Sequence, residues 1–256
     1  MSEPLPRTFL LVDTERFSDR DDVQQAYLRR MLYGIVDRTL LAAGIDETLR
    51  LRADRGDAIM ELIDVRAPLT ALLRALLTEV PAQLHAVNRM AASTAQIRLR
   101  AVLATGYVVI DEYDGWVGSD LNHACRLLDG APLKDALRER SDDYALCVSE
   151  AVYTGIVRHD YTGIPAEKFT QITVPSKNGP LQAWLYGPPP TGLPQPSADA
   201  ASAPLPTSAP APAPAPAPAD PNGIHFRGVN HGIVAGRIQG DISIGATNPR
   251  RSAEPS

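Results

Sequence analysis

The residues best suited to chemistry lie in residues 116–127, which read WVGSDLNHACRL. A turn at Gly118 followed by a helix would place Asn122 and Arg126 four residues apart, on one helical face. An amide can orient a sugar hydroxyl and a guanidinium can neutralise a phosphate charge, so this pair suits phosphate-ester chemistry. The same pattern also fits a plain amphipathic helix whose polar side merely faces water. In that alternative the residues packed inward would be Leu121, Ala124, Cys125 and Leu128.

Two acids upstream could supply a metal site. Asp13 ends an apolar run in residues 8–17, TFLLVDTERF, and Asp57 follows Gly56 in residues 50–62, RLRADRGDAIMEL. The Gly-Asp break predicts a hairpin, which would carry Asp57 to the edge of a sheet beside Asp13. Two carboxylates at one edge repel each other unless a cation lies between them, and oxygen ligands suit Mg²⁺ or Mn²⁺. A single Asp at the end of a strand can instead cap a turn or a helix.

The elements that must position these residues are helices, whose apolar residues recur about every 3.6 positions, and strands, whose apolar residues recur at every second position. The spacing predicts helices over residues 23–41, stopped by Gly44, and over residues 69–90, where Pro81 can interrupt the helix. Two further helices are expected, a short one over residues 133–137 and one over residues 149–157 that Ser149 caps. Strands are expected over residues 8–13, in the hairpin around Asp57, over residues 97–103 and 107–111 on either side of Gly106, and over residues 144–148, 169–174 and 181–186.

Composition excludes several classes of function. The net charge of −5 over 256 residues, with no basic stripe, argues against a nucleic-acid partner. Cys125 and Cys147 lack metal-ligand spacing and are expected to be free thiols in a reducing cytosol. We find neither a charged leader followed by a long apolar region nor an apolar stretch of about 20 residues, so a cytoplasmic protein without a membrane partner is expected.

The composition changes abruptly after residue 186. Residues 187–222 hold 13 of the 23 prolines, including an Ala-Pro repeat. Such a segment cannot form a packed core and favours an extended conformation. We therefore expect a domain over residues 1–186, a disordered Pro/Ala-rich linker over 187–222, and a tail over 223–256.

Residues 7–186 resemble the catalytic domain of class III nucleotidyl cyclases, the adenylate and guanylate cyclase family. The resemblance rests on Asp13 followed by Phe17, on the Gly-Asp hairpin at Asp57, and on Gly-x-x-x-Asn-x-x-x-Arg-Leu, which contains Asn122 and Arg126. It implies an α+β fold with a ferredoxin-like mixed sheet and covering helices.

The resemblance also implies an activity and its site. In the family the positions of Asp13 and Asp57 hold two Mg²⁺ or Mn²⁺ ions. Asn122 and Arg126 would come from the other protomer of a homodimer, and a nucleoside triphosphate would be converted to a 3′,5′-cyclic nucleotide and pyrophosphate. The chain would then act in intracellular signalling.

Three positions depart from the family pattern. Ala53 stands where a Lys or Glu helps to select the base, and the second selecting position aligns with Asp114 or Gly115 only after a one-residue shift. Gln182 is the nearest match to a phosphate-binding Lys of the last strand, with Lys177 five residues earlier. The base is therefore left open, cyclic pyrimidines included. The alternative function is a catalytically degenerate sensor or scaffold.

The tail resembles bacterial amyloid signalling motifs. Its core is Ile242-Ser243-Ile244-Gly245, within an apolar, glycine-containing stretch that suits cross-β stacking. The resemblance implies partners that carry a matching motif, in defence or cell-death signalling. A disordered tail with an incidental strand-like patch is the alternative.

Overall fold

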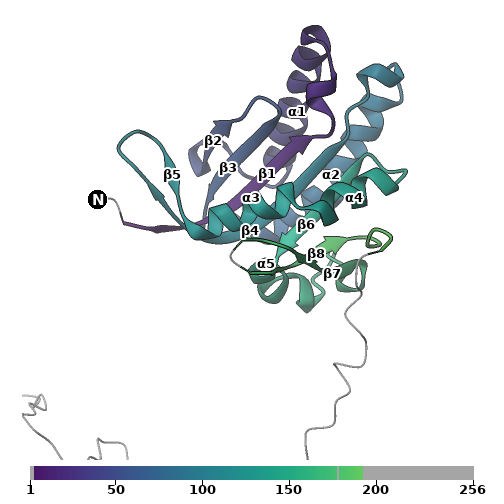
Figure 1. Cartoon of the computed structure of the whole chain (residues 1–256). Helices are drawn as coiled ribbons and strands as arrows, with labels where there is room; N and C mark the ends of the chain where they lie inside the picture. The colour runs from purple at the N-terminus through teal and green to yellow at the C-terminus, as the bar shows by residue number, and fades with distance from the viewer. Residues whose placement is uncertain (1–2, 178, 193–256) are drawn as a thin grey trace, which may run out of the picture. The chain divides into compact units, whose positions relative to one another are not determined.

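The computed structural model describes residues 3–177 and 179–192, and its centre is a mixed sheet (Figure 1). The strand order is β2-β3-β1-β4-β6-β8-β7, with β5 paired to β4 beside this path. The β4–β6 pair is parallel and the other pairs are antiparallel. The strands are β1 (Leu5–Thr14), β2 (Arg50–Asp54), β3 (Ala58–Asp64), β4 (Leu99–Ile110), β5 (Trp116–Val117), β6 (Tyr144–Ser149), β7 (Phe169–Val174) and β8 (Leu181–Tyr186).

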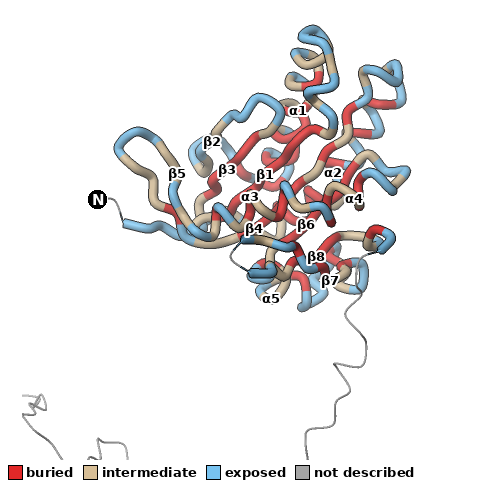
Figure 2. The backbone as a smooth tube through the Cα atoms, viewed as in Figure 1, coloured by how far each residue is buried: buried red, intermediate tan, exposed pale blue. Residues whose placement is uncertain are grey.

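Helices cover both faces of the sheet and create two hydrophobic cores (Figure 2). α1 and α2 pack on one face, with α5 at the same core, while α3 and α4 pack on the other. This arrangement confirms the predicted α+β fold with a mixed sheet and covering helices. The helices are α1 (Asp22–Ala42), α2 (Leu69–Asn88), α3 (Ser119–Asp129), α4 (Ala131–Glu139) and α5 (Glu150–Gly155).

Strand β1 is central and buried on both faces. Leu10 and Val12 belong to the core under α1 and α2, whereas Phe9 and Leu11 belong to the core under α3 and α4. Because side chains alternate along a strand, Asp13 continues the second series and is directed to the α3 and α4 face. The periodicity of one strand therefore decides on which side of the sheet this acid acts.

Ion pairs fasten the β2–β3 hairpin to α1. The fully buried carboxylate of Glu61 pairs with Arg50 at 2.8 Å and with Arg52 at 2.5 Å. Both guanidinium groups also reach Asp37 of α1, at 3.0 and 2.6 Å. Breaking a buried network of this kind costs several kcal/mol, in the range of about 3–5 kcal/mol, because a charge is left without a partner. These ion pairs therefore hold the hairpin that carries Asp57 against α1.

Two expectations about chain breaks were wrong. β4 continues through Gly106 as one strand, because Gly106 keeps its place opposite Arg7 in the β1–β4 ladder, and the side chain of Asp120 occupies the space where a Cβ would lie. The Asp120 carboxylate accepts a hydrogen bond from the Tyr107 backbone N–H at 2.8 Å. α2 continues through Pro81, which lies on its exposed side, where a missing N–H is least disruptive.

The helix capped by Ser149 is shorter than predicted and ends at Gly155, before a 3₁₀ turn over Val157–His159.

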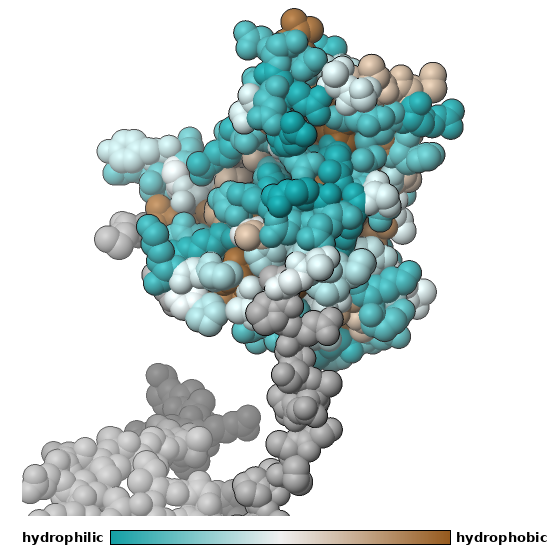
Figure 3. All heavy atoms as spheres, turned by 45° about the vertical axis from the view of Figure 1, so that its right-hand side comes forward, coloured by the Kyte–Doolittle hydropathy of each residue, from teal (hydrophilic) through white to brown (hydrophobic). Residues whose placement is uncertain are grey.

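Cys125 and Cys147 are both free, as expected. Among the described residues, no helix combines the length and apolarity needed to cross a membrane. The view in Figure 3 shows a mostly hydrophilic surface with small, separate apolar patches. The tail, and the linker beyond residue 192, lie outside the described residues.

Candidate active site

The strand register brings the two predicted metal acids together. Asp13 lies opposite Ala58 in the β1–β3 pair, and the Thr14 backbone N–H donates to the carbonyl oxygen of Asp57 at 3.0 Å. Asp13 is 7% exposed, whereas Asp57 is exposed at the hairpin tip. A buried and an exposed carboxylate thus share one corner of the sheet.

A third residue at this corner, Arg100, was missed by sequence reasoning. It lies opposite Asp13 in the β1–β4 pair, and its Nε and Nη2 donate to the two carboxylate oxygens of Asp13 at 2.8 and 2.6 Å. The available signal was an arginine that shares a strand face with buried Val102 and Ala104. A charged side chain on such a face needs a partner, and here the partner is a predicted site residue.

Electrostatics set Asp13 apart from an ordinary surface acid. Burial raises the pKa of Asp13 to about 6, although Arg100 acts in the opposite direction. The negative charges of Asp57 and Asp129 raise this pKa further. The corner therefore favours positive charge close to Asp13.

The donor set fits a divalent ion that is shared with substrate. Within the described ranges, no three His, Cys, Asp or Glu side chains gather as a metal cage. Mg²⁺ is commonly held by one or two carboxylates together with water and substrate phosphates, and a site of two acids meets that requirement. The hydrogen bonds from Arg100 use one acceptor position on each oxygen of Asp13, and each oxygen has another.

Helix α3 presents the predicted polar pair. It starts directly after Gly118, and its buried residues are Leu121, Ala124, Leu127 and Leu128. Asn122 is exposed and Arg126 is half-buried, with the Nη1 atom of Arg126 buried without a hydrogen-bond partner. In residues 3–177 and 179–192, neither side chain joins a hydrogen bond or ion pair, so the pair is free to meet a ligand or another protomer. The prediction that they act on a second protomer's acids stays a prediction.

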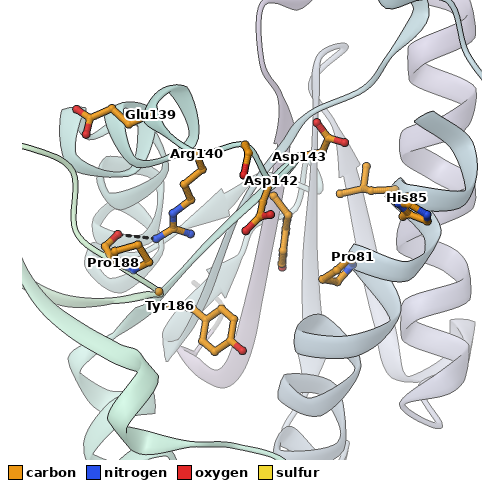
Figure 4. Close-up of a pocket in the computed structure, with 12 residues that line it drawn as sticks. Pro81, His85, Glu139, Arg140, Asp142, Asp143, Tyr186 and Pro188 are labelled. Atoms are coloured by element: carbon orange, nitrogen blue, oxygen red, sulfur yellow. Dashed lines mark hydrogen bonds between the residues drawn. The ribbon is translucent and has the colours of Figure 1, made fainter. Parts of the chain in front are cut away.

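Two further hollows lie away from the acids. One, of about 560 Å³, lies between α3 and the start of β8 and is lined by His123 and Gln182. The Gln182 amide oxygen accepts hydrogen bonds from Gln171 and Thr173 of β7. The second, of about 540 Å³, is shown in Figure 4, where Arg140 faces His85 across the hollow and donates to the carbonyl oxygen of Pro188. It contains none of the predicted site residues.

Solved structures share this architecture. The adenylate/guanylate cyclase/hydrolase from Silicibacter pomeroyi has a TM-score of 0.51 at 21% identity, and the match covers 73% of this chain and 99% of that one. The guanylyl cyclase Cya2 matches with a TM-score of 0.51 at 15% identity, over 77% and 97% of the two chains. A bacterial light-regulated adenylyl cyclase matches with a TM-score of 0.50 at 14% identity, over 72% and 91%. This chain has the nucleotidyl cyclase fold.

The likeness lies in the structure rather than in the sequence. No family model and no curated protein matches the sequence. Within the cyclase fold, the corner formed by Asp13, Asp57 and Arg100 and the polar face of α3 are the groups with the chemistry to act on a phosphate ester.

Proposed function

We propose that this chain is a nucleotidyl cyclase that acts on a nucleoside triphosphate. The ribose 3′-oxygen forms a bond to the α-phosphorus while the bond from that phosphorus to the bridging oxygen breaks. The products are a 3′,5′-cyclic nucleotide and pyrophosphate, and the proton of the 3′-hydroxyl is lost. The proposal draws support from the cyclase fold together with the residues at the Asp13 corner.

Each named residue has a distinct role in this proposal. Asp13 and Asp57 hold two Mg²⁺ or Mn²⁺ ions, which when bound acidify the 3′-hydroxyl and offset the charge of the triphosphate. Arg126 stabilises the negative charge that develops at the α-phosphate, and Asn122 orients the ribose. Arg100 keeps the Asp13 carboxylate ionised, and its two hydrogen bonds fix the orientation of that carboxylate.

We further propose a homodimer in which Asn122 and Arg126 serve the acids of the partner. Exposed apolar side chains lie on β1 and on the arm formed by the end of β4 with β5, the projecting hairpin at the left of Figure 1, and the register places Tyr107 and Val117 on one face of that arm. They are Leu5, Tyr107, Tyr113 and Val117. Exposed apolar side chains on a projecting arm suit contact with another chain, and a second copy of the chain is the partner that would complete the site.

The observation that carries the proposal is that the cyclase-fold sheet places buried Asp13 beside Asp57. The test is to incubate the full chain with ATP, GTP, CTP and UTP plus Mn²⁺ and to identify products by mass spectrometry. One cyclic nucleotide is expected, and Asp57→Asn should lower its rate of formation by at least about 100-fold.

Glu167→Gln is a matched control, because it converts an exposed carboxylate far from the site to an amide. It should leave the rate unchanged. Equal rates in the two variants would refute the assignment of Asp57. If a folded, dimeric chain gives no product from any nucleotide, the sensor or scaffold function takes its place.

A further inference from the structure

A side chain of α1 contacts the hairpin turn that carries Asp57. The two Nη atoms of Arg29 donate to the two carboxylate oxygens of Asp54, with 2.6 Å between Nη1 and Oδ1. Nη1 also donates to the carbonyl oxygen of Gly56, the residue directly before Asp57, at 3.4 Å. One guanidinium group thus binds the turn at a side chain and at the backbone.

Asp54 connects this guanidinium to the shape of the turn. Its Oδ1 atom also accepts a hydrogen bond from the Gly56 backbone N–H at 2.7 Å, so the aspartate side chain sets the backbone two residues further on. Gly56 has a φ of +85°, which glycine adopts without steric cost. Because glycine can also leave that conformation easily, the turn needs contacts from outside the hairpin to keep one shape.

The ring of Tyr33, one helical turn further along α1, orients Arg29. The Cζ atom of Arg29 lies 5.1 Å from the ring centroid, and its Nη2 donates to the Tyr33 hydroxyl at 3.3 Å. The Cζ atom of Arg52, in β2, lies 4.9 Å from the same centroid. These cation–π contacts fix the guanidinium of Arg29 relative to both the helix and the hairpin.

The exposure of the pair argues for a role at the site rather than in global stability. The side chains of Arg29 and Asp54 are 40% and 35% exposed, and pairs this exposed contribute little to folding. The turn that they hold continues into Asp57, whose carbonyl oxygen accepts the Thr14 N–H beside Asp13. The turn is therefore held both by β1 and by α1.

We propose that Arg29 is a positioning residue for the metal site, because it fixes, through Asp54 and Gly56, the turn from which Asp57 projects. The inference rests on the proposed function for the metal, but it does not require turnover. The partners of Arg29 among the described residues are Asp54, Gly56 and Tyr33, so its effect on the site passes through the backbone of the turn.

The test measures Mn²⁺ binding to the full chain without nucleotide, from the relaxation enhancement of water protons. Binding at the proposed site is the part that Asp57→Asn removes. Arg29→Gln should raise the Mn²⁺ concentration for half-saturation of this part about tenfold, as for residues that orient metal ligands. Loss of a positive charge alone would instead strengthen cation binding, so a weakening reports position and not charge.

A second measurement follows the turn directly. Hydrogen exchange, read by mass spectrometry, should become faster in Arg29→Gln for a peptide that covers residues 54–58, with little change in β1. The Tm should fall by less than about 4 °C, because the pair is partly exposed.

Arg30→Gln is the matched control. It removes the same charge from the next position of α1, where the side chain is exposed and the structure describes no ion pair. Its half-saturation should differ from that of wild type by less than about twofold, and its exchange over residues 54–58 should not change.

Three results overturn the inference: no Asp57-dependent binding of Mn²⁺ by wild type, equal half-saturation in Arg29→Gln and Arg30→Gln, or unchanged exchange over residues 54–58 in Arg29→Gln. The proposed function fails separately. Mn²⁺ binding that depends on Arg29, in a chain that makes no cyclic nucleotide, would support the positioning role and refute the cyclase.

Discussion

The pair formed by Asp13 and Arg100 links stability to the chemistry of the site at the scale of single residues. Both residues are largely buried, with side-chain atoms 10% exposed in Asp13 and 12% exposed in Arg100, and they share two hydrogen bonds. A buried acid alone would take up a proton, because burial disfavours its charge. Arg100 opposes that tendency, so it favours the ionised carboxylate, which is the form that the proposed metal site requires.

Arg100→Ala is expected to lower the free energy of unfolding by about 3 kcal/mol at pH 8, because it leaves Asp13 buried without its partner. Without the guanidinium, the pKa of Asp13 rises further above its unfolded value. A raised carboxyl pKa means that stability is lost as pH rises, so the deficit should shrink toward pH 5. Urea denaturation at both pH values measures this.

The control for this prediction is Arg66→Ala. Arg66 pairs with Asp64 at 2.9 Å but is 74% exposed, and its loss should change stability by less than about 0.5 kcal/mol at either pH. Similar losses in the two variants would show that the Asp13–Arg100 pair has no special energetic role.

At the scale of elements, the start of α3 depends on a close approach to β4. A Cβ atom on Gly118 would lie 2.6 Å from the backbone oxygen of Tyr107, and a backbone atom cannot move aside as a flexible side chain can. Gly118→Ala should therefore push α3 away from β4, with Asn122 and Arg126 on it. We expect a loss of about 2 kcal/mol in stability and a larger relative loss of the proposed cyclase activity.

Gly34 in the interior of α1 provides the matched control, because nothing lies within 4 Å of the position of its Cβ. Gly34→Ala should be neutral or stabilise by up to about 1 kcal/mol, since alanine favours helix. Denaturation curves and product rates of the two variants, measured side by side, decide the matter. A Gly118→Ala protein as active as Gly34→Ala would contradict the close-approach argument.

The sequence was informative where local chemistry determines structure. Gly56-Asp57 predicted the hairpin, and the apolar run before Asp13 predicted a buried strand. Arg100 was not predicted, because its partner lies 87 residues away and only the strand register brings them together. The same applies to a basic hollow of about 440 Å³ beside Asp13, which combines residues from the turn after β1, the start of β4 and α4, namely Glu15, Arg16, Arg98, Arg100, Lys134 and Arg138. The prediction at Gly106 was wrong because pairing with Arg7, 99 residues earlier in the chain, keeps the strand unbroken.

At the scale of the whole molecule, the proposed dimer divides each site between two chains. Asp57→Asn and Arg126→Ala should each be inactive alone, because one lacks a metal acid and the other lacks the phosphate-stabilising guanidinium. Co-expression with two different tags should restore about a quarter of wild-type activity. Half of the randomly assembled dimers are mixed, and each mixed dimer has one intact site of two.

The mixed dimers can be isolated through both tags, so that assembly is verified independently of activity. Absence of cyclic product from a verified mixed dimer would place Asn122 and Arg126 outside the shared site. A mixture of Asp57→Asn with Glu167→Gln serves as the positive control, since the second chain is fully competent.

The last described residues are hydrogen-bonded to the end of α4. The backbone N–H and hydroxyl of Thr191 both donate to the carboxylate of Glu139, at 2.7 and 2.9 Å, and Arg140 holds the carbonyl oxygen of Pro188. Over the last residues that the structure describes, the chain after β8 is therefore anchored to the end of α4 rather than leaving the domain directly from the sheet.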